Sequence, residues 1–264
     1  MDSEALASAG LLVDRTGPVL TVTLDRPAVR NAQTPAMWRA LAAVGESVDE
    51  EVRVVVVRGS GHSFSAGLDR AMLDPSTIGG DVETVAGLLA GSDEEMSATI
   101  DAFQRGFTWL RDPRFVSVAA VQGHAIGAGF QLALSCDLRV AADDARFCMK
   151  ESALGLVPDL TGTKPLVECV GYARALEICA TARTVEADEA ERIGLVAAVV
   201  PADQLDATVA NLVGALTAPM AGAVRETKAL LQGAADRSLD DQRRLEREAQ
   251  VRRFRDVARV LVGG

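Results

Sequence analysis

The sequence is poor in cysteine and has no excess of positive charge. Lysine and arginine (27) are outnumbered by aspartate and glutamate (37), so the 264-residue chain carries a net charge of −10. This charge disfavours non-specific binding to nucleic acid or to an anionic membrane surface. We therefore expect neither a nucleic-acid partner nor a membrane partner, and an anionic ligand would have to be held by local donors.

The cysteines do not have the spacing of a zinc site, and we expect no metal; they are Cys136, Cys148, Cys169 and Cys179. No secretory signal precedes them, so we expect reduced, mostly buried thiols in a cytoplasmic protein. One run, residues 115–136, lacks formal charge and has the length of a membrane span. Its glutamines, histidine and three glycines indicate instead a buried strand followed by a buried helix.

The first part of the chain alternates between strand and helix patterns. Leu11–Val13 and Val19–Leu24 flank a turn-forming cluster and predict a β-hairpin. Thr34, followed by proline, predicts the capped start of a helix. The uninterrupted apolar run Val54–Val57 predicts a strand covered on both faces. This alternation indicates right-handed β-α-β units in an α/β fold.

The length suits one sizeable domain with a helical appendage. We place a core in residues 1–200 and a helical region in residues 201–264, where charges alternate over Asp240–Arg255. Residues 72–98 differ in character, because Pro75, several glycines and a cluster of acids predict a long, weakly structured insertion.

Two glycine-rich turns follow predicted strands. Residues 122–131 come after the apolar run Val116–Val121, and Phe64–Asp69 comes after Val54–Val57. A turn from a strand into the start of a helix directs backbone N–H groups and the positive end of the helix dipole at one point. Two such turns can place two N–H donors on one oxygen, which a developing enolate requires.

These turns resemble the two signature segments of the crotonase family, the enoyl-CoA hydratases and isomerases. The segments are Phe64–Asp69 and Gly123–Asp137, and the similarity runs from about Leu11 to Pro201. Further segments match in order and spacing: Leu24–Pro27, Arg30–Ala32, Phe147–Gly155 and Thr181–Gly194. The resemblance implies an α/β crotonase-type spiral of β-β-α units with a helical C-terminal trimerisation region, assembled as a homotrimer or a dimer of trimers.

The resemblance also implies an acyl-CoA thioester as substrate and no separate cofactor, since CoA is part of the substrate. The oxyanion donors would be the backbone N–H groups of Leu68 and Ala128. Alanine at the second position is acceptable if its φ is negative. Further candidates for contacts with the substrate or its CoA part are Arg26, Arg30, Ala32, Ala66, Gly67, Asp69 and Gly127. The 72–98 segment would then be a lid or a wall of the acyl pocket, or else a tolerated surface insertion.

Proton transfer is where the sequence departs from the family's hydratases. They resemble this chain but carry one glutamate at the position of Gln131 and another at that of Glu151. Gln131 can bond to a water but cannot take its proton. A single carboxylate can still move a proton between two carbons, so Glu151 favours double-bond isomerisation. Gln131→Glu should then raise hydration if a water fits between the two carboxylates.

Asp159 lies eight residues after Glu151, the offset at which the dienoyl-CoA isomerases of the family carry a catalytic aspartate. A turn or helix-cap role for Asp159 is equally open. Enoyl-CoA hydration is the alternative function, and an acyl-CoA-binding protein without turnover is the third. His124 is expected to be packed and hydrogen-bonded, and Asp137 to support the structure. The family's closing Phe-x-x-Lys-Arg-x-Pro segment is absent.

Overall fold

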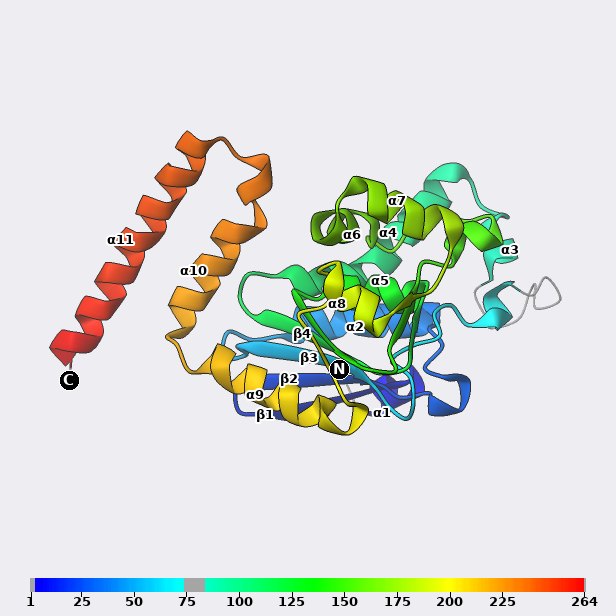
Figure 1. Cartoon of the computed structure of the whole chain (residues 1–264), viewed down its shortest axis with the longest axis horizontal. Coiled ribbons are helices and arrows are strands. Elements are labelled where there is room, and N and C mark those ends of the chain that lie inside the picture. Colours follow the sequence, from blue (N-terminus) through cyan, green and yellow to red (C-terminus); the bar gives the residue numbers. More distant parts are fainter. Residues whose placement is uncertain (1–2, 74–83, 264) are drawn as a thin grey trace.

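The computed structural model describes residues 3–73 and 84–263, and its elements form an α/β spiral followed by a helical arm (Figure 1). A six-stranded sheet has the order β1-β2-β3-β4-β6-β9, and a smaller sheet has the order β5-β7-β8. The strands are β1 (Leu11–Thr16), β2 (Val19–Leu24), β3 (Val54–Gly59), β4 (Val116–Val121), β5 (His124–Ile126), β6 (Leu138–Ala142), β7 (Arg146–Cys148), β8 (Val185–Glu186) and β9 (Ala198–Val200).

Helices cover both faces of the large sheet and continue into the arm. The α-helices are α1 (Ser3–Ser8), α2 (Pro35–Ser47), α3 (Val85–Leu88), α4 (Asp93–Thr108), α5 (Ala128–Ser135), α6 (Thr163–Val170), α7 (Tyr172–Thr181), α8 (Ala187–Arg192), α9 (Leu205–Thr217), α10 (Ala221–Gln232) and α11 (Leu239–Gly263). Short 3₁₀ helices are η1 (Pro27–Val29), η2 (Arg70–Leu73), η4 (Trp109–Arg111), η5 (Glu151–Leu154), η6 (Ala202–Gln204) and η7 (Ala234–Asp236).

The strands follow the predicted pattern. β1 and β2 form the expected antiparallel hairpin, and β3, β4, β6 and β9 add in parallel. Every residue of β4 is buried, because alternate side chains enter two different cores. Val55 and Val57 of β3 enter the main core, whereas Val54 and Val56 pack with α9 on the other face. The uncharged run therefore begins as a strand buried on both faces, as predicted, and α5 completes it.

The predicted helix after Thr34 is confirmed as α2, in whose first turn the amide of Met37 donates to the Thr34 hydroxyl. α2 lies against α4 in the main core. The rings of Trp38 and Phe103 are 4.9 Å apart, and a Cβ at Gly106 would come within 2.4 Å of the Trp38 carbonyl oxygen. Glycine at this position therefore sets how closely α4 approaches α2.

The 72–98 segment is more ordered at its end than predicted. Residues 74–83 lie outside the described residues, so the prediction of a lid or pocket wall over 72–98 falls partly there. From Asp93 onward the segment is helix α4, which begins with a capping box between Ser92 and Glu95. The prediction of weak structure was wrong here because the acids form the first turn of a helix, where they interact favourably with the helix dipole.

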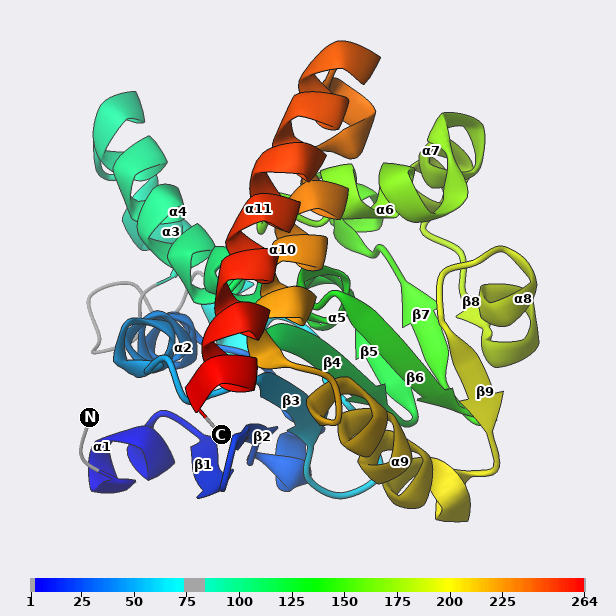
Figure 2. The ribbon, with the colours of Figure 1, turned by 90° about the vertical axis from the view of Figure 1, so that its left-hand side faces the viewer.

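Figures 1 and 2 show α9 lying along the sheet, while α10 and α11 stand away from it as a pair. We call α10 and α11 the arm. In the described chain no single helix is long and apolar enough to cross a membrane, and one pair bent by 101°, Ala202–Thr217 with Ala221–Asp236, meets the length and composition requirements only jointly.

A buried lysine attaches the arm to the sheet. Lys228 of α10 donates to the carbonyl oxygens of Asp112 (2.6 Å) and Phe115 (2.7 Å) and to the Asp137 carboxylate (2.7 Å). Asp137 also accepts from the backbone amide of Ser117 at 2.8 Å, which is the structural role expected of it. Burial lowers the pKa of Lys228, and the Asp137 carboxylate opposes that change.

Replacing Lys228 with methionine is expected to lower the free energy of unfolding by about 3–5 kcal/mol, because the partly buried Asp137 carboxylate and two backbone carbonyls lose their donor. Urea unfolding at a fixed protein concentration measures this loss. Lys164→Met is the control: its ion pair with Glu168 is exposed, and its loss should cost less than about 1 kcal/mol. Equal effects of the two substitutions would contradict the anchoring role of Lys228.

Candidate active site

The two glycine-rich turns lie side by side. The amide of Ser65 donates to the carbonyl of His124 at 2.7 Å, and the amide of Ile126 donates back to the carbonyl of Ser65 at 3.0 Å. Gly67 has a φ of +86°, and a Cβ there would come within 2.3 Å of the Ile126 carbonyl oxygen. Only glycine fits this contact, so Gly67 determines how closely the turns approach.

The backbone N–H of Leu68 points away from Gln33, the residue with which Leu68 pairs. Gln33 pairs with Leu68 in a parallel bridge, in which the amide of Gln33 donates to Gly67 (2.7 Å) and the amide of Asp69 donates to Gln33 (2.8 Å). Since bonds on successive residues of an extended chain alternate in direction, the N–H of Leu68 faces the opposite side, toward the second turn.

The second donor, Ala128, is the first residue of α5, where a helix leaves its amides without intrahelical partners. Ala128 does not have a positive φ, so the condition for alanine at this position is met. The Cβ position of Gly67 lies 3.5 Å from the nitrogen of Ala128. Standard bond lengths then place the nitrogens of Leu68 and Ala128 at most about 7 Å apart. Within residues 3–73 and 84–263, neither amide donates to a protein acceptor.

Glu151 is buried beside this pair of amides. It opens η5, and its Oε1 accepts a hydrogen bond from Nε2 of Gln131 at 2.7 Å. A Cβ at Gly127, the residue before Ala128, would lie 3.2 Å from the same Oε1. Oε2 is buried and has no hydrogen-bond partner among the described residues. The site therefore contains a carboxylate with one engaged oxygen and one free oxygen.

Burial raises the pKa of Glu151 above that of an ordinary glutamate. The hydrogen bond from Gln131 opposes this rise, and the negative charge of Asp159 adds to it. A carboxylate whose pKa is raised toward neutrality is a stronger base than one in water, and so is better suited to removing a proton from carbon.

Asp159 lies within electrostatic reach of Glu151 without bonding to it. Asp159 is exposed to solvent. The surrounding protein still removes part of the water around its carboxylate, and this partial desolvation raises its pKa. The backbone carbonyl of Asp159 accepts from Nε2 of Gln104 on α4 at 2.6 Å. The negative charge of Asp159 is thus close enough to disfavour ionisation of Glu151.

The residues expected to contact CoA surround the first turn, but their side chains differ in availability. The Arg26 guanidinium donates to the carbonyl of Ala32 (2.7 Å) and to the carboxylate of Asp69 (2.8 Å). Burial raises the pKa of Asp69, but the hydrogen bond from Arg26 helps to lower it below the usual value. Arg30 is exposed, and its carbonyl accepts from the amide of Ala66 at 2.8 Å. Arg26 is therefore an internal clamp, whereas the Arg30 guanidinium faces solvent.

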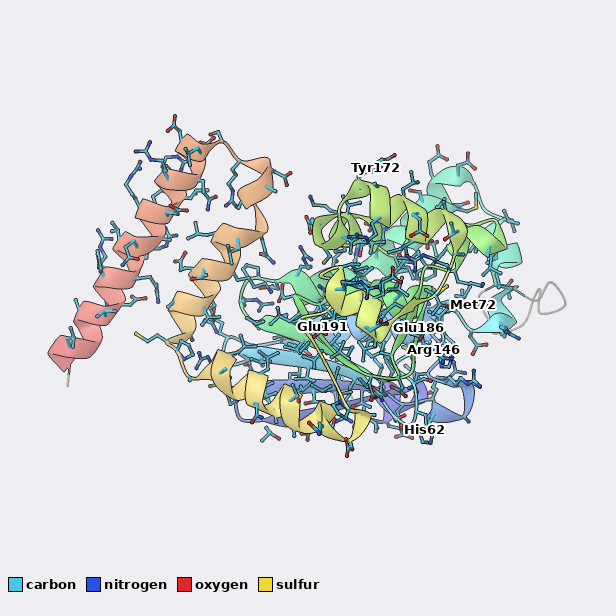
Figure 3. All side chains as sticks on the ribbon, in the orientation of Figure 1. His62, Met72, Arg146, Tyr172, Glu186 and Glu191 are labelled. Carbon is cyan, nitrogen blue, oxygen red and sulfur yellow. The ribbon has the colours of Figure 1, made fainter. Side chains whose placement is uncertain are left out.

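Residues that the sequence reasoning did not single out hold the turns in place. Gln33 donates to the hydroxyl of Ser65 at 3.1 Å and accepts from the indole of Trp38 at 2.8 Å. Its position directly after the Arg30–Ala32 motif was the only signal. His124 is hydrogen-bonded to the hydroxyl of Ser63 (3.2 Å), as predicted. His62 is exposed at an edge of the molecule (Figure 3).

In the described part of the chain, no group of three or more His, Cys, Asp or Glu side chains is placed to hold a metal ion. The four cysteines have free thiols; Cys136 and Cys148 are buried, and Cys169 and Cys179 are partly so.

Comparison with known proteins agrees with the fold. A family model described as enoyl-CoA hydratase/isomerase matches residues 14–259. The chain is 32% identical to a short-chain-enoyl-CoA hydratase of Clostridium acetobutylicum, covering 90% of this chain and 87% of that protein. It is 33% identical to the 2,3-dehydroadipyl-CoA hydratase of Escherichia coli, with coverages of 73% and 70%.

Among solved structures, a candidate enoyl-CoA hydratase of Thermobifida fusca in complex with acetoacetyl-CoA is 49% identical, with a TM-score of 0.92 and coverages of 97% and 98%. The same protein in complex with CoA gives a TM-score of 0.91 at 48% identity, with coverages of 98% and 98%. The α/β spiral with its helical arm is thus a crotonase fold. The chain belongs to the enoyl-CoA hydratase/isomerase family and is an acyl-CoA enzyme.

Proposed function

We propose that the protein shifts a double bond in an acyl-CoA thioester, with Glu151 as the single proton carrier. The amides of Leu68 and Ala128 would bind the thioester oxygen and stabilise the negative charge that develops there when a proton leaves carbon. The buried Oε2 of Glu151 would take that proton from one carbon and return it to another. Supporting this, Leu68 and Ala128 offer unused donors beside a carboxylate with one free oxygen.

The contact between Gln131 and Glu151 carries the choice of isomerisation over hydration. Hydration needs a water held and deprotonated by a base while a second group helps to protonate carbon. Here Nε2 of Gln131 lies 2.7 Å from Oε1 of Glu151, so no water fits between these two atoms. An amide at this position also cannot accept the proton of a water.

Hydration is the second candidate, because the curated relatives named above are hydratases. The two functions differ in product. The test is incubation with a 3-enoyl-CoA and with a 2-enoyl-CoA. Isomerisation would convert the first into the conjugated 2-enoyl ester, which ultraviolet absorbance follows directly. Conversion of the 2-enoyl ester to a 3-hydroxyacyl ester at a comparable or higher rate would support hydration instead.

We further propose that the CoA part lies over the first turn, with Arg30 facing its phosphates. Arg30 is exposed, and its side chain has no acidic partner among the residues that the structure describes. The complexes of the Thermobifida fusca protein with CoA and acetoacetyl-CoA support a CoA ester as the ligand class.

We propose a homotrimer, or a pair of trimers, assembled through the arm. One face of α11 packs toward α10 through Ala249 and Arg253, while apolar side chains on another face remain exposed. Phe254 is 66% exposed and Leu261 is 76% exposed. With the exposed Val251 and Val257 they follow the three- and four-residue spacing of one helix face. An apolar stripe of this kind on a protruding arm favours burial against a second copy.

Replacing Phe254 and Leu261 together with glutamate is expected to convert the oligomer to a monomer, because two charges would be buried in each contact. Light scattering at micromolar concentration measures the mass. Leu12→Glu is the matched control, since Leu12 is an exposed apolar residue on β1; this variant should remain oligomeric. A monomeric mass for the unmodified protein would contradict the proposed assembly.

A further inference from the structure

We propose that Gln131 is a positioning residue that ties one oxygen of Glu151, so that the other oxygen alone carries protons and water is kept from the place where hydration would start. This inference rests on the proposed function, because it assigns the way in which the same carboxylate is controlled. In this proposal Gln131 acts on the reaction through Glu151 and does not contact the reacting atoms.

The orientation of the Gln131 amide is set by its acceptor side. Oε1 accepts from the backbone amides of Leu160 (2.9 Å) and Gly162 (3.2 Å). Because an N–H group cannot donate to the NH₂ end of an amide, these two bonds exclude the flipped arrangement. Nε2 must then face Glu151 and can only donate to it. The direction of the Gln131–Glu151 bond is therefore fixed by the backbone.

The loop of residues 160–162, which fixes this orientation, has a strained backbone. Thr161, between the two donors, has a φ of +68°, an unfavourable conformation for a β-branched residue. Such strain persists only where the surroundings determine it, and it is typical of functional sites. A Cβ at Gly162 would come within 2.6 Å of Cγ of Gln131. The strained turn and the glycine together bring two amides onto one side-chain oxygen.

The result is an unequal pair of oxygens on Glu151. Oε1 receives the Gln131 bond and lies beside Gly127, next to the amide of Ala128. Oε2 is buried and unbonded among the residues of the described chain, although a buried carboxylate oxygen without a donor is costly. An oxygen kept in this state is available to take a proton from a bound substrate.

Burial and the charge of Asp159 raise the pKa of Glu151, while the side-chain N–H of Gln131 and the backbone N–H groups of Lys150 and Glu151 lower it. The titratable groups that interact with Glu151 are Asp159 from the following loop, Cys148 from β7 and Cys179 from α7. The neighbouring Lys150 is exposed. Removing the N–H of Gln131 would therefore raise the pKa of Glu151, and the base would become active only at higher pH.

The decisive variant is Gln131→Glu, for which the sequence predicts a gain of hydration only if a water fits between the two carboxylates. A carboxylate at residue 131 would still accept from Leu160 and Gly162, so the loop is retained. Its other oxygen would face Oε1 of Glu151 in place of the Gln131 N–H donor, so the two carboxylates must share a proton or move apart. Two carboxylates in contact share one proton. A shared proton would remove the free base form of Glu151 at neutral pH, so the double-bond shift should slow there.

The experiment is the pH profile of kcat/KM for the double-bond shift in unmodified protein, Gln131→Glu and Gln131→Met. On the acid side of the profile, kcat/KM rises as the base loses its proton. We expect the midpoint of this rise to move up by about 1–2 pH units in both variants. At pH values below both pKa values this corresponds to a loss of about 10–100-fold, which is recovered as the pH rises. A purely structural role would lower the rate equally at all pH values.

Gln104→Met is the matched control, because Gln104 holds the same loop through the carbonyl of Asp159 but does not contact Glu151; the midpoint of its rise should not move. An unmoved midpoint in Gln131→Glu, or efficient hydration by it, would overturn the inference. If Gln131→Met does not fold, Gln131→Glu decides alone. Full activity of Glu151→Gln would instead overturn the proposed function, so the two failures are distinguishable.

Discussion

Replacing Glu151 with glutamine is expected to slow the double-bond shift about 10²–10⁴-fold, the usual scale for removing a positioned acid–base group. The amide is nearly the same size as the carboxylate but cannot accept a proton from carbon. Binding of the CoA ester should be retained, because the oxyanion amides of Leu68 and Ala128 belong to the backbone. The measurement is kcat and KM with a 3-enoyl-CoA, together with a binding titration.

Glu186→Gln is the control for this experiment. Glu186, labelled with Arg146 in Figure 3, pairs with that arginine at 3.3 Å, and its side chain is 57% exposed. The same chemical change there should leave the rate within about twofold, since exposed ion pairs contribute little. Isomerisation that is indifferent to Glu151→Gln would contradict the assignment of the base.

Replacing Gly67 with alanine is expected to lower kcat/KM by about 10²–10³-fold, the scale for losing one oxyanion donor. The added Cβ would lie 2.3 Å from the carbonyl oxygen of Ile126, so the two turns must separate. Separation moves the amide of Leu68 away from that of Ala128. The kinetics should be compared with thermal unfolding, because the positive φ of Gly67 also costs stability when alanine occupies it.

Gly171→Ala is the matched control for Gly67→Ala. Gly171 has a φ of +77°, close to the +86° of Gly67, but its Cβ position meets nothing within 4 Å. The two variants should lose similar stability from backbone strain, whereas only Gly67→Ala should lose the rate. A full rate in a folded Gly67→Ala variant would show that the spacing of the turns does not matter for catalysis.

Local patterns in the sequence were sufficient for most of the fold. The strands at Val54 and Val116, the hairpin before them and the cap at Thr34 depend on neighbouring residues, and all are present. The glycines of the two turns were likewise readable, because a positive φ or a close backbone approach is a property of the residue itself. The helix that begins at Asp93 was missed because its acidic first turn resembles a solvated loop.

The control of Glu151 could not be predicted from sequence, since it depends on contacts between distant residues. Gln131 is recognisable as an amide where the family's hydratases have an acid. Its orientation, however, is decided by amides 29 and 31 residues further along the chain. The pairing of Lys228 with Asp137 spans 91 residues and left no local pattern. Such contacts arise from tertiary packing, which periodicity and motif spacing do not encode.

We propose that this site transfers a proton between carbons and does not add water. The most direct measurement is NMR product analysis in D₂O after incubation with 2-enoyl-, 3-enoyl- and dienoyl-CoA esters. We expect the 3-enoyl ester to become the 2-enoyl ester, with no appreciable 3-hydroxyacyl-CoA from any substrate and with all turnover lost in Glu151→Gln. Efficient formation of 3-hydroxyacyl-CoA by the unmodified protein, or tight binding without turnover of any ester, would contradict the claim.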